Sequence, residues 1–265
     1  KEGGHDVHGA PLGGVEIAAA REALAWPHAP FEVPQAVYDA WDAKGQGQAL
    51  EKAWNALFDA YSERHPAEAE QFERRMRGEL PANWDANLPS YSADDKGLAT
   101  RQHSYNCLNA IGPNLPELIG GSADLTHSNL TDIKGEKGFQ KGAEANRYLH
   151  FGVRELAMGA VLNGMSLTKV RPYGSGFFVF SDFSRPAMRL AAIMEIPVIY
   201  VFTHDSIGVG EDGPTHQPVE HLAALRAIPS LLTMRPADGV ETAECWELAL
   251  QNDRRPSLIA FSRQD

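Results

Sequence analysis

From residue 98 onward, short apolar segments alternate with longer segments of helical periodicity, and this alternation limits the folds open to the chain. The apolar segments have the length and β-branched content of buried strands and lie at 117–121, 148–152, 171–176, 197–203, 230–235 and 256–261. Helical patterns lie at 98–111, 154–167, 180–194, 217–227 and 239–251. The alternation predicts an α/β domain with a mostly parallel six-stranded sheet and helices on both of its faces.

The first 97 residues carry no such alternation. A glycine-rich loop at 1–14 is followed by helical patterns, and the segment 79–97 holds prolines, asparagines and acids with little periodicity. The helical patterns lie at 15–26, 35–43, 46–64 and 66–77. We expect their aromatic side chains Trp41, Trp54, Phe58 and Tyr61 to pack these helices against another part of the protein or a partner. We therefore predict two parts, a loop and helical linker at 1–97 and an α/β domain at 98–265.

The composition is that of a soluble globular protein, with 43% hydrophobic and 22% charged residues. The formal net charge of −11 argues against nucleic acid as a partner. No apolar run reaches the roughly 18 residues of a membrane span, so no membrane partner is expected either. The two cysteines, Cys107 and Cys245, have no metal-ligand spacing and are expected to be free thiols, which favours a cytoplasmic location.

Polar and aromatic side chains follow the predicted strands where the strands end. The polar ones are Ser122, Asp124, His127, Ser128, Asn129, Arg154, Glu155, His204, Asp205, Ser262 and Arg263. After the strand at 171–176 comes an aromatic stripe, Phe177, Phe178, Phe180 and Phe183. Because the carboxyl ends of parallel strands meet at one edge, and open α/β sheets hold ligands there, we expect the binding site at this edge.

The loop Thr203–Pro218 follows a buried strand and combines glycines with histidines and acids. The spacing of His204 and His216 fits no zinc pattern and no thiolate accompanies them, so no metal ligand is predicted. The acidic turn Gly210–Gly213 resembles a Mg²⁺-diphosphate motif. No asparagine partner follows about 30 residues later, so that interpretation is rejected.

Structural roles compete with binding roles at several of these positions. Glu155 opens a predicted helix, where a carboxylate complements the helix dipole. Asp124 suits a turn or a helix cap. Phe177, Phe180 and Phe183 recur every third residue, which also suits packing in a core. The pattern alone leaves both interpretations open in each case.

Six segments resemble signature motifs of the transketolase family. The first is the loop Thr203–Pro218, which reads THDSIGVGEDGPTHQP. The others are His8–Leu12 (HGAPL), Gly120–Leu125 (GGSADL), Phe151–Glu155 (FGVRE), Arg235–Asp238 (RPAD) and Ser262–Gln264 (SRQ). They follow the family's order along the whole chain, which makes the resemblance specific.

The resemblance implies that the chain corresponds to the end of a diphosphate-binding domain, a helical linker and a pyrimidine-binding domain. Members of the family use thiamine diphosphate with Mg²⁺ or Ca²⁺, and the metal ligands of their motif lie outside this chain. Their active sites form between two subunits, so a homodimer or a complementing domain is the implied partner. The chain alone is expected to be a partial, inactive enzyme.

The resemblance also implies residue roles. Glu155, His216 and His8 match the catalytic residues, Glu155 by hydrogen-bonding the aminopyrimidine of the cofactor and the histidines by lying near the reacting carbonyl. The implied cofactor-binding residues are Glu155, Phe177, Phe180, Phe183 and Asp124. The implied substrate-binding residues are His8, Arg101, Ser128, His204, Asp212, His216 and Arg263, whose donors suit a sugar phosphate.

The implied reaction transfers a two-carbon ketol unit between a ketose phosphate and an aldose phosphate, as in the pentose phosphate pathway. A non-catalytic assembly or regulatory module with the same fold is one alternative, and a dihydroxyacetone synthase-like enzyme is another. The pair His204 and His216, together with Asp212, argues against 1-deoxyxylulose-phosphate synthases and dehydrogenase β subunits.

Overall fold

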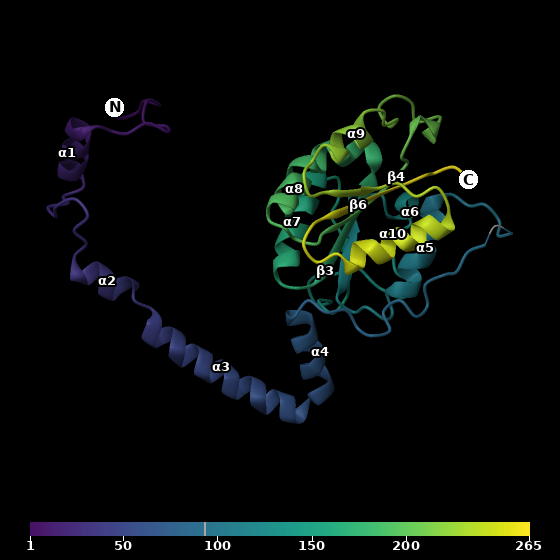
Figure 1. Ribbon diagram of the computed structural model, residues 1–265, viewed down its shortest axis with the longest axis horizontal. Helices are drawn as coiled ribbons and strands as arrows, with labels where there is room; N and C mark the ends of the chain where they lie inside the picture. Colours follow the sequence, from purple (N-terminus) through teal and green to yellow (C-terminus); the bar gives the residue numbers. More distant parts are fainter. Residues whose placement is uncertain (93) are drawn as a thin grey trace. The chain divides into compact units, whose positions relative to one another are not determined.

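The computed structural model describes residues 1–92 and 94–265 (Figure 1). The chain divides into two compact units, Lys1–Ala69 and Glu70–Asp265. This division is earlier in the chain than the boundary near residue 97 that the sequence pattern suggests, and the linker segment 79–97 belongs to the second unit.

The first unit is helical, with α1 (Gly14–Ala23), α2 (Gln35–Trp41), α3 (Lys44–Arg64) and the beginning of α4 (Pro66–Met76). None of the residues of α1, α2 and α3, all of which are described, is buried. Trp41 remains 85% exposed, so its expected packing partner does not lie within this unit. Trp54 and Phe58 do stack on one another, with ring centroids 6.1 Å apart along one helix face.

The second unit contains a six-stranded sheet, within the described residues, whose strands are all parallel. In chain order they are β1 (Leu118–Ser122), β2 (Tyr148–His150), β3 (Arg171–Phe177), β4 (Ile199–Thr203), β5 (Leu232–Met234) and β6 (Ser257–Phe261). Their spatial order is β2-β1-β3-β4-β6-β5. The predicted parallel sheet is therefore confirmed, with every strand within a few residues of its expected position.

Helices cover both faces of this sheet, as predicted (Figure 1). They are α5 (Thr100–Ile111), α7 (Glu155–Leu167), α8 (Ser181–Ile193), α9 (His221–Arg226) and α10 (Gly239–Gln251), with a single turn, α6 (Thr126–Asn129), after β1. Strand β4 shows how one segment serves both layers. Its Tyr200 and Phe202 pack in the core under α7, α8 and α9, whereas Ile199 and Val201 pack in the core under α5 and α10. Side chains alternate across a strand, so a continuous apolar run is what two covered faces require.

Helix α9 begins at His221, although the sequence pattern places its start near residue 217. The Gln217 side chain instead donates hydrogen bonds to the carbonyl oxygens of Ile207 and Gly210, at 3.0 and 3.3 Å. This side chain therefore holds the preceding loop, and the helix starts one turn later. Separately, no helix in the described part of the chain is both long and apolar enough for a membrane crossing.

Candidate active site

The carboxyl ends of the strands carry most of the expected site residues, as the fold predicts. Strand β3 leads into the short 3-10 helix η1 (Phe178–Phe180), and β4 leads into the loop that contains η2 (Ile207–Val209). Because β3 and β4 are neighbours in the sheet, the aromatic stripe and the histidine loop emerge side by side. The site is assembled at this junction.

The aromatic stripe forms a stepped series of rings. The rings of Phe177 and Phe180 are nearly parallel, with an angle of 9° between their planes and centroids 6.1 Å apart. The ring centroid of Phe183 follows at 6.2 Å from that of Phe180. Phe177 is buried, whereas Phe183 is 63% exposed. Phe178 faces the core with His221 and Phe202 instead. One ring of the stripe therefore packs in the core, while its outer rings offer an apolar surface for a flat ligand.

His204 lies against this series. Its ring centroid is 3.8 Å from that of Phe177, and its backbone has a positive φ of 61°. A non-glycine residue in this region is strained, and such strain is found at functional sites. Burial, together with the nearby cations Arg101 and Arg263, lowers the pKa of His204 to about 4. The imidazole is therefore neutral at neutral pH.

A chain of hydrogen bonds orients the His204 ring. The Thr203 hydroxyl donates to Asn129 Oδ1 at 2.7 Å, and Asn129 Nδ2 donates to Ser122 Oγ at 3.0 Å. Since the Thr203 proton is used in this way, the 2.8 Å contact between Thr203 Oγ1 and His204 Nδ1 requires the imidazole to donate. Nε2 is then the unprotonated nitrogen of the ring and carries a lone pair. The sequence placed Asn129 among the polar residues that follow the strands and Thr203 at the start of the loop, but it indicated no specific role for either.

His216 reaches the same place from the far end of the loop. Its ring meets Phe180 edge-on, with centroids 5.3 Å apart and planes at 73°. The Asp212 carboxylate raises the pKa of His204, opposing the effect of burial, and His216 lowers it, so both groups act on the same imidazole. The acidic turn between them uses Gly210 and Gly213 at positive φ, which only glycine adopts without strain.

Arg101 and Arg263 supply positive charge at this edge. Arg101 Nη1 donates to the Ser128 carbonyl oxygen at 2.8 Å, while its Nε is buried without a hydrogen-bond partner among the described residues. Burial lowers the pKa of Arg101, and the neighbouring Arg263 lowers it further. The two guanidinium groups repel each other, and Arg101 has a buried N–H donor without a partner in the described part of the chain. Both features suit an anionic ligand such as a phosphate group.

Asp124 and Ser128 line a cavity of about 390 Å³ after β1, together with Leu125, Thr126, His127 and His150. Asp124 has a positive φ of 63°, so its backbone forms a sharp turn there. No side-chain cap accompanies α6, and the N-cap position is occupied by Leu125. Asp124 is therefore a turn residue that lines this cavity rather than the cap of that helix.

Glu155 is the first residue of α7 and follows edge strand β2. It is only 7% exposed. A carboxylate in the first turn does complement the helix dipole, but burial is costly for a charged group, so the dipole alone is a weak reason for this position. A buried carboxylate at the ligand-binding edge fits a hydrogen bond to a ring nitrogen of a bound cofactor. His8, by contrast, lies on an exposed turn of the first unit.

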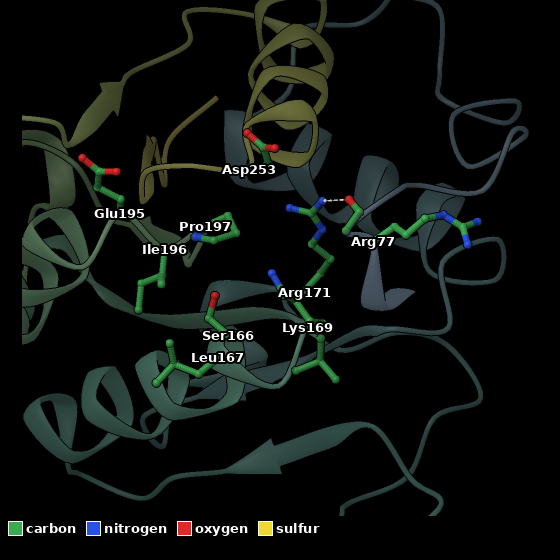
Figure 2. Close-up of a pocket in the computed structure, with 11 residues that line it drawn as sticks. Arg77, Ser166, Leu167, Lys169, Arg171, Glu195, Ile196, Pro197 and Asp253 are labelled. Atoms are coloured by element: carbon green, nitrogen blue, oxygen red, sulfur yellow. Dashed lines mark hydrogen bonds between the residues drawn. The ribbon is translucent and has the colours of Figure 1, made fainter. Parts of the chain in front are cut away.

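A different cavity lies at the opposite, amino-terminal edge of the sheet (Figure 2). It measures about 170 Å³ and is lined by the beginning of β3 and the residues before β4. Arg171 donates to the Gly78 carbonyl oxygen there at 2.7 Å, and burial lowers the pKa of this arginine. None of the expected site residues contributes to it, so it is separate from the site at the carboxyl edge.

The pKa of His204 leads to a measurable pH dependence of stability. An unfolded histidine titrates near 6.5 and the folded one near 4, so the unfolded chain binds more protons in this window and folding weakens as the pH falls. Between pH 7 and pH 5 this one group should cost about 2 kcal/mol. Urea unfolding of His204→Asn, which tolerates positive φ, should show a correspondingly shallower loss. The control is the exposed His127→Asn, and equal pH slopes in all three proteins would contradict the expectation.

Comparison with known proteins agrees with this geometry. Residues 96–265 match the family described as transketolase, pyrimidine binding domain, and residues 1–81 match transketolase, thiamine diphosphate binding domain. Transketolase 1 of Vibrio vulnificus is 52% identical over 270 aligned residues, covering 100% of this chain and 41% of that protein. A crystal structure of Pichia stipitis transketolase in complex with sedoheptulose 7-phosphate aligns with a TM-score of 0.91 and 42% identity, over 96% of this chain and 39% of that one.

A more distant structure, a split-gene transketolase described as an inactive β4 tetramer, aligns with a TM-score of 0.52 and 27% identity. The alignment covers 64% of this chain and 53% of the split-gene protein. The chain thus spans about two fifths of the length of the curated relatives it matches. With one family match extending over more than half of its residues and a second at its beginning, the chain belongs to the transketolase family.

Proposed function

We propose that this chain forms the pyrimidine-binding half of an enzyme that transfers a two-carbon ketol unit between sugar phosphates. One observation carries the proposal: the buried neutral His204 lies against Phe177 while two arginine charges act on it. An apolar ring surface beside a cationic, donor-rich patch suits a flat heteroaromatic cofactor next to a phosphorylated sugar. The domain division at residue 97 and the roles below are part of the same proposal.

Thiamine diphosphate fits the residues at the carboxyl edge. Its aminopyrimidine ring would lie against Phe177, Phe180 and Phe183, with Glu155 hydrogen-bonded to a ring nitrogen and Asp124 nearby. When bound, this cofactor supplies the carbanion chemistry that no amino-acid side chain provides. The Glu155 carboxyl would share a proton with the pyrimidine nitrogen and so favour the cofactor's reactive tautomer. Its Mg²⁺ or Ca²⁺ ligands would come from residues outside this chain.

The sugar phosphate would occupy the cationic patch. Arg101, Arg263, Ser128 and His204 would hold the phosphate, Asp212 a sugar hydroxyl, and His216 with His8 the reacting carbonyl. Because His204 is neutral with a free Nε2, an arriving phosphate dianion would raise its pKa and draw a proton onto this nitrogen. Substrate binding should then be coupled to proton uptake. Pichia stipitis transketolase structures described as complexes with sedoheptulose 7-phosphate, fructose 6-phosphate and xylulose 5-phosphate support this substrate class.

The complete enzyme would be a homodimer, or this chain with a complementing domain, acting in the pentose phosphate pathway. Two free cysteines within the described chain support the reducing cytoplasm as its location. Burial raises the pKa of Cys107 to about 12 and that of Cys245 to about 11, so both thiols are unreactive at neutral pH.

Complementation tests the proposal. The 265 residues alone should give no turnover of xylulose 5-phosphate and ribose 5-phosphate with thiamine diphosphate and Mg²⁺. The same chain supplied with the remaining domains of a relative should transfer the ketol unit, measured as formation of sedoheptulose 7-phosphate. Turnover by the homogeneous chain alone would contradict the half-site, and lack of turnover in the complemented enzyme would contradict the activity.

A non-catalytic assembly module is the second candidate. The split-gene relative described as an inactive β4 tetramer favours it, because a chain of this fold occurs there without activity. An assembled complex that stays inactive after complementation would select this candidate. A dihydroxyacetone synthase-like activity is distinguished in the same assay by offering formaldehyde in place of the aldose phosphate.

A further inference from the structure

Three potential metal ligands, Asp182, Glu220 and His221, lie close together, and none of them has been assigned a role above. One ligand atom from each lies within 4.8 Å of the others. Asp182 is in the first turn of α8, whereas Glu220 and His221 stand at the start of α9. Strand β4 and its long loop separate the two places in the sequence, so spacing gave no sign of the group.

His221 is the unusual member of this cluster. It is 5% exposed, and neither of its ring nitrogens has a hydrogen-bond partner among the described residues. A buried imidazole without hydrogen bonds is costly, because its nitrogens have lost water and no hydrogen bond replaces it. The ring of Phe178 lies beside it, with centroids 5.9 Å apart, and offers no polar atom.

The ring is instead aimed at carboxylates. Nε2 lies 3.2 Å from Asp182 Oδ2, and Nδ1 lies 3.9 Å from Glu220 Oε2. Asp182 is 47% exposed and Glu220 is exposed, so an ion has a route from solvent. Two ligands bound at about 2.0–2.1 Å in a tetrahedral arrangement lie roughly 3.3–3.4 Å apart, close to the 3.2 Å between Nε2 and Asp182.

We propose that Asp182, Glu220 and His221 bind a divalent transition-metal ion of the Zn²⁺ type, which ties the start of α8 to the start of α9. One imidazole and two carboxylates are ligands that Zn²⁺ accepts, and water completes the fourth position. Two negative charges face a doubly charged cation, so the site is electrically balanced. This site is distinct from the Mg²⁺ or Ca²⁺ of the proposed cofactor and does not depend on the proposed activity. It also departs from the sequence-based prediction that the chain holds no metal ligand.

Cobalt titration tests the proposal, because four-coordinate Co²⁺ absorbs visible light and reports its own ligands. The chelator-treated 265-residue chain should bind one Co²⁺ per chain in this form, and Zn²⁺ should displace it. Asp182→Asn and His221→Gln should each raise the dissociation constant for Co²⁺ by at least tenfold. Loss of an outer-shell partner alone lowers metal affinity by about 10–100-fold. Zn²⁺ should also raise the Tm of the parent chain but not that of either variant.

His103→Gln is the matched control. His103 is buried to the same extent as His221 and also has an unpaired ring nitrogen, but it belongs to no such group of carboxylates in the described chain. It should bind Co²⁺ like the parent. Asp182→Asn alters a half-exposed side chain and keeps the test decisive if His221→Gln does not fold. No binding by the parent, or unchanged binding in a folded Asp182→Asn or His221→Gln variant, overturns the proposal.

Discussion

Replacing Glu155 by glutamine in the complete enzyme should lower kcat by about 10²–10⁴-fold, the range for loss of a positioned acid or base. The amide fills nearly the same volume, so packing at the start of α7 should persist. What it loses is the acidic proton that the proposed role places on the pyrimidine nitrogen. The dissociation constant for thiamine diphosphate should change far less than kcat, because the aromatic rings and the missing domain still bind the cofactor.

The measurement is steady-state ketol transfer in the complemented enzyme, alongside a cofactor titration. Glu244→Gln, an exposed carboxylate on α10, provides the control for a change of one charge and should match the parent. If Glu155→Gln turns over at the parental rate, Glu155 is not the cofactor-activating acid. Its burial would then need a structural explanation.

Gly121→Ala should destabilise the second unit by about 3 kcal/mol or more, at the upper end for overpacking. A Cβ at this position would overlap the backbone carbonyl of Leu149 in neighbouring strand β2, and backbone atoms cannot move aside as a flexible side chain can. A Cβ on Gly120 would likewise overlap the backbone carbonyl oxygen of Tyr173 on β3. The two glycines of the GGSADL motif are thus needed for β1 to lie between its neighbours. The expected readout is a lower midpoint of urea unfolding with an unchanged m-value.

Gly164→Ala is the opposite control. Gly164 lies inside α7 and needs no positive φ. Apart from its own chain neighbours and the nearby helix backbone, a Cβ added to it would meet no atom of the described chain within 4 Å. Alanine there should stabilise the chain by about 0.4–1 kcal/mol by restricting the unfolded state. Similar midpoints for Gly121→Ala and the parent would show that β1 and β2 separate at little cost.

The strands and helices of the second unit were predictable because their signals are local. Strand β4 is apolar at every position but its last and is covered on both faces, and α10 starts at Gly239 just after Asp238, whose carboxylate accepts from Glu241 N at 2.9 Å. Each signal depends on neighbours within a turn or a pleat. The start of helix α9 was predicted one turn too early, because the Gln217 side chain hydrogen-bonds to the preceding loop and no local pattern indicates this.

The site was predictable in its position but not in its internal contacts. The Thr203 hydroxyl bonds Asn129, which lies 74 positions earlier in the chain, and Arg235 Nε donates to Asp205 Oδ2 at 2.6 Å across 30 positions. Such pairs form only once β1, β4 and β5 take their places in the sheet. The neutral state of His204 likewise depends first on burial and then on Arg101 and Arg263, which are far apart in the sequence.

By itself, the sequence determined the alternating elements, the parallel sheet, the edge that holds the site and, through its motifs, the family. These follow from periodicity and from chemistry that is written in consecutive residues. Only the tertiary structure decided the strand order, the tautomer of His204 and the meeting of Asp182 with His221. These properties depend on burial and on distances between segments far apart in the chain, where desolvation and charge act through space rather than along the sequence.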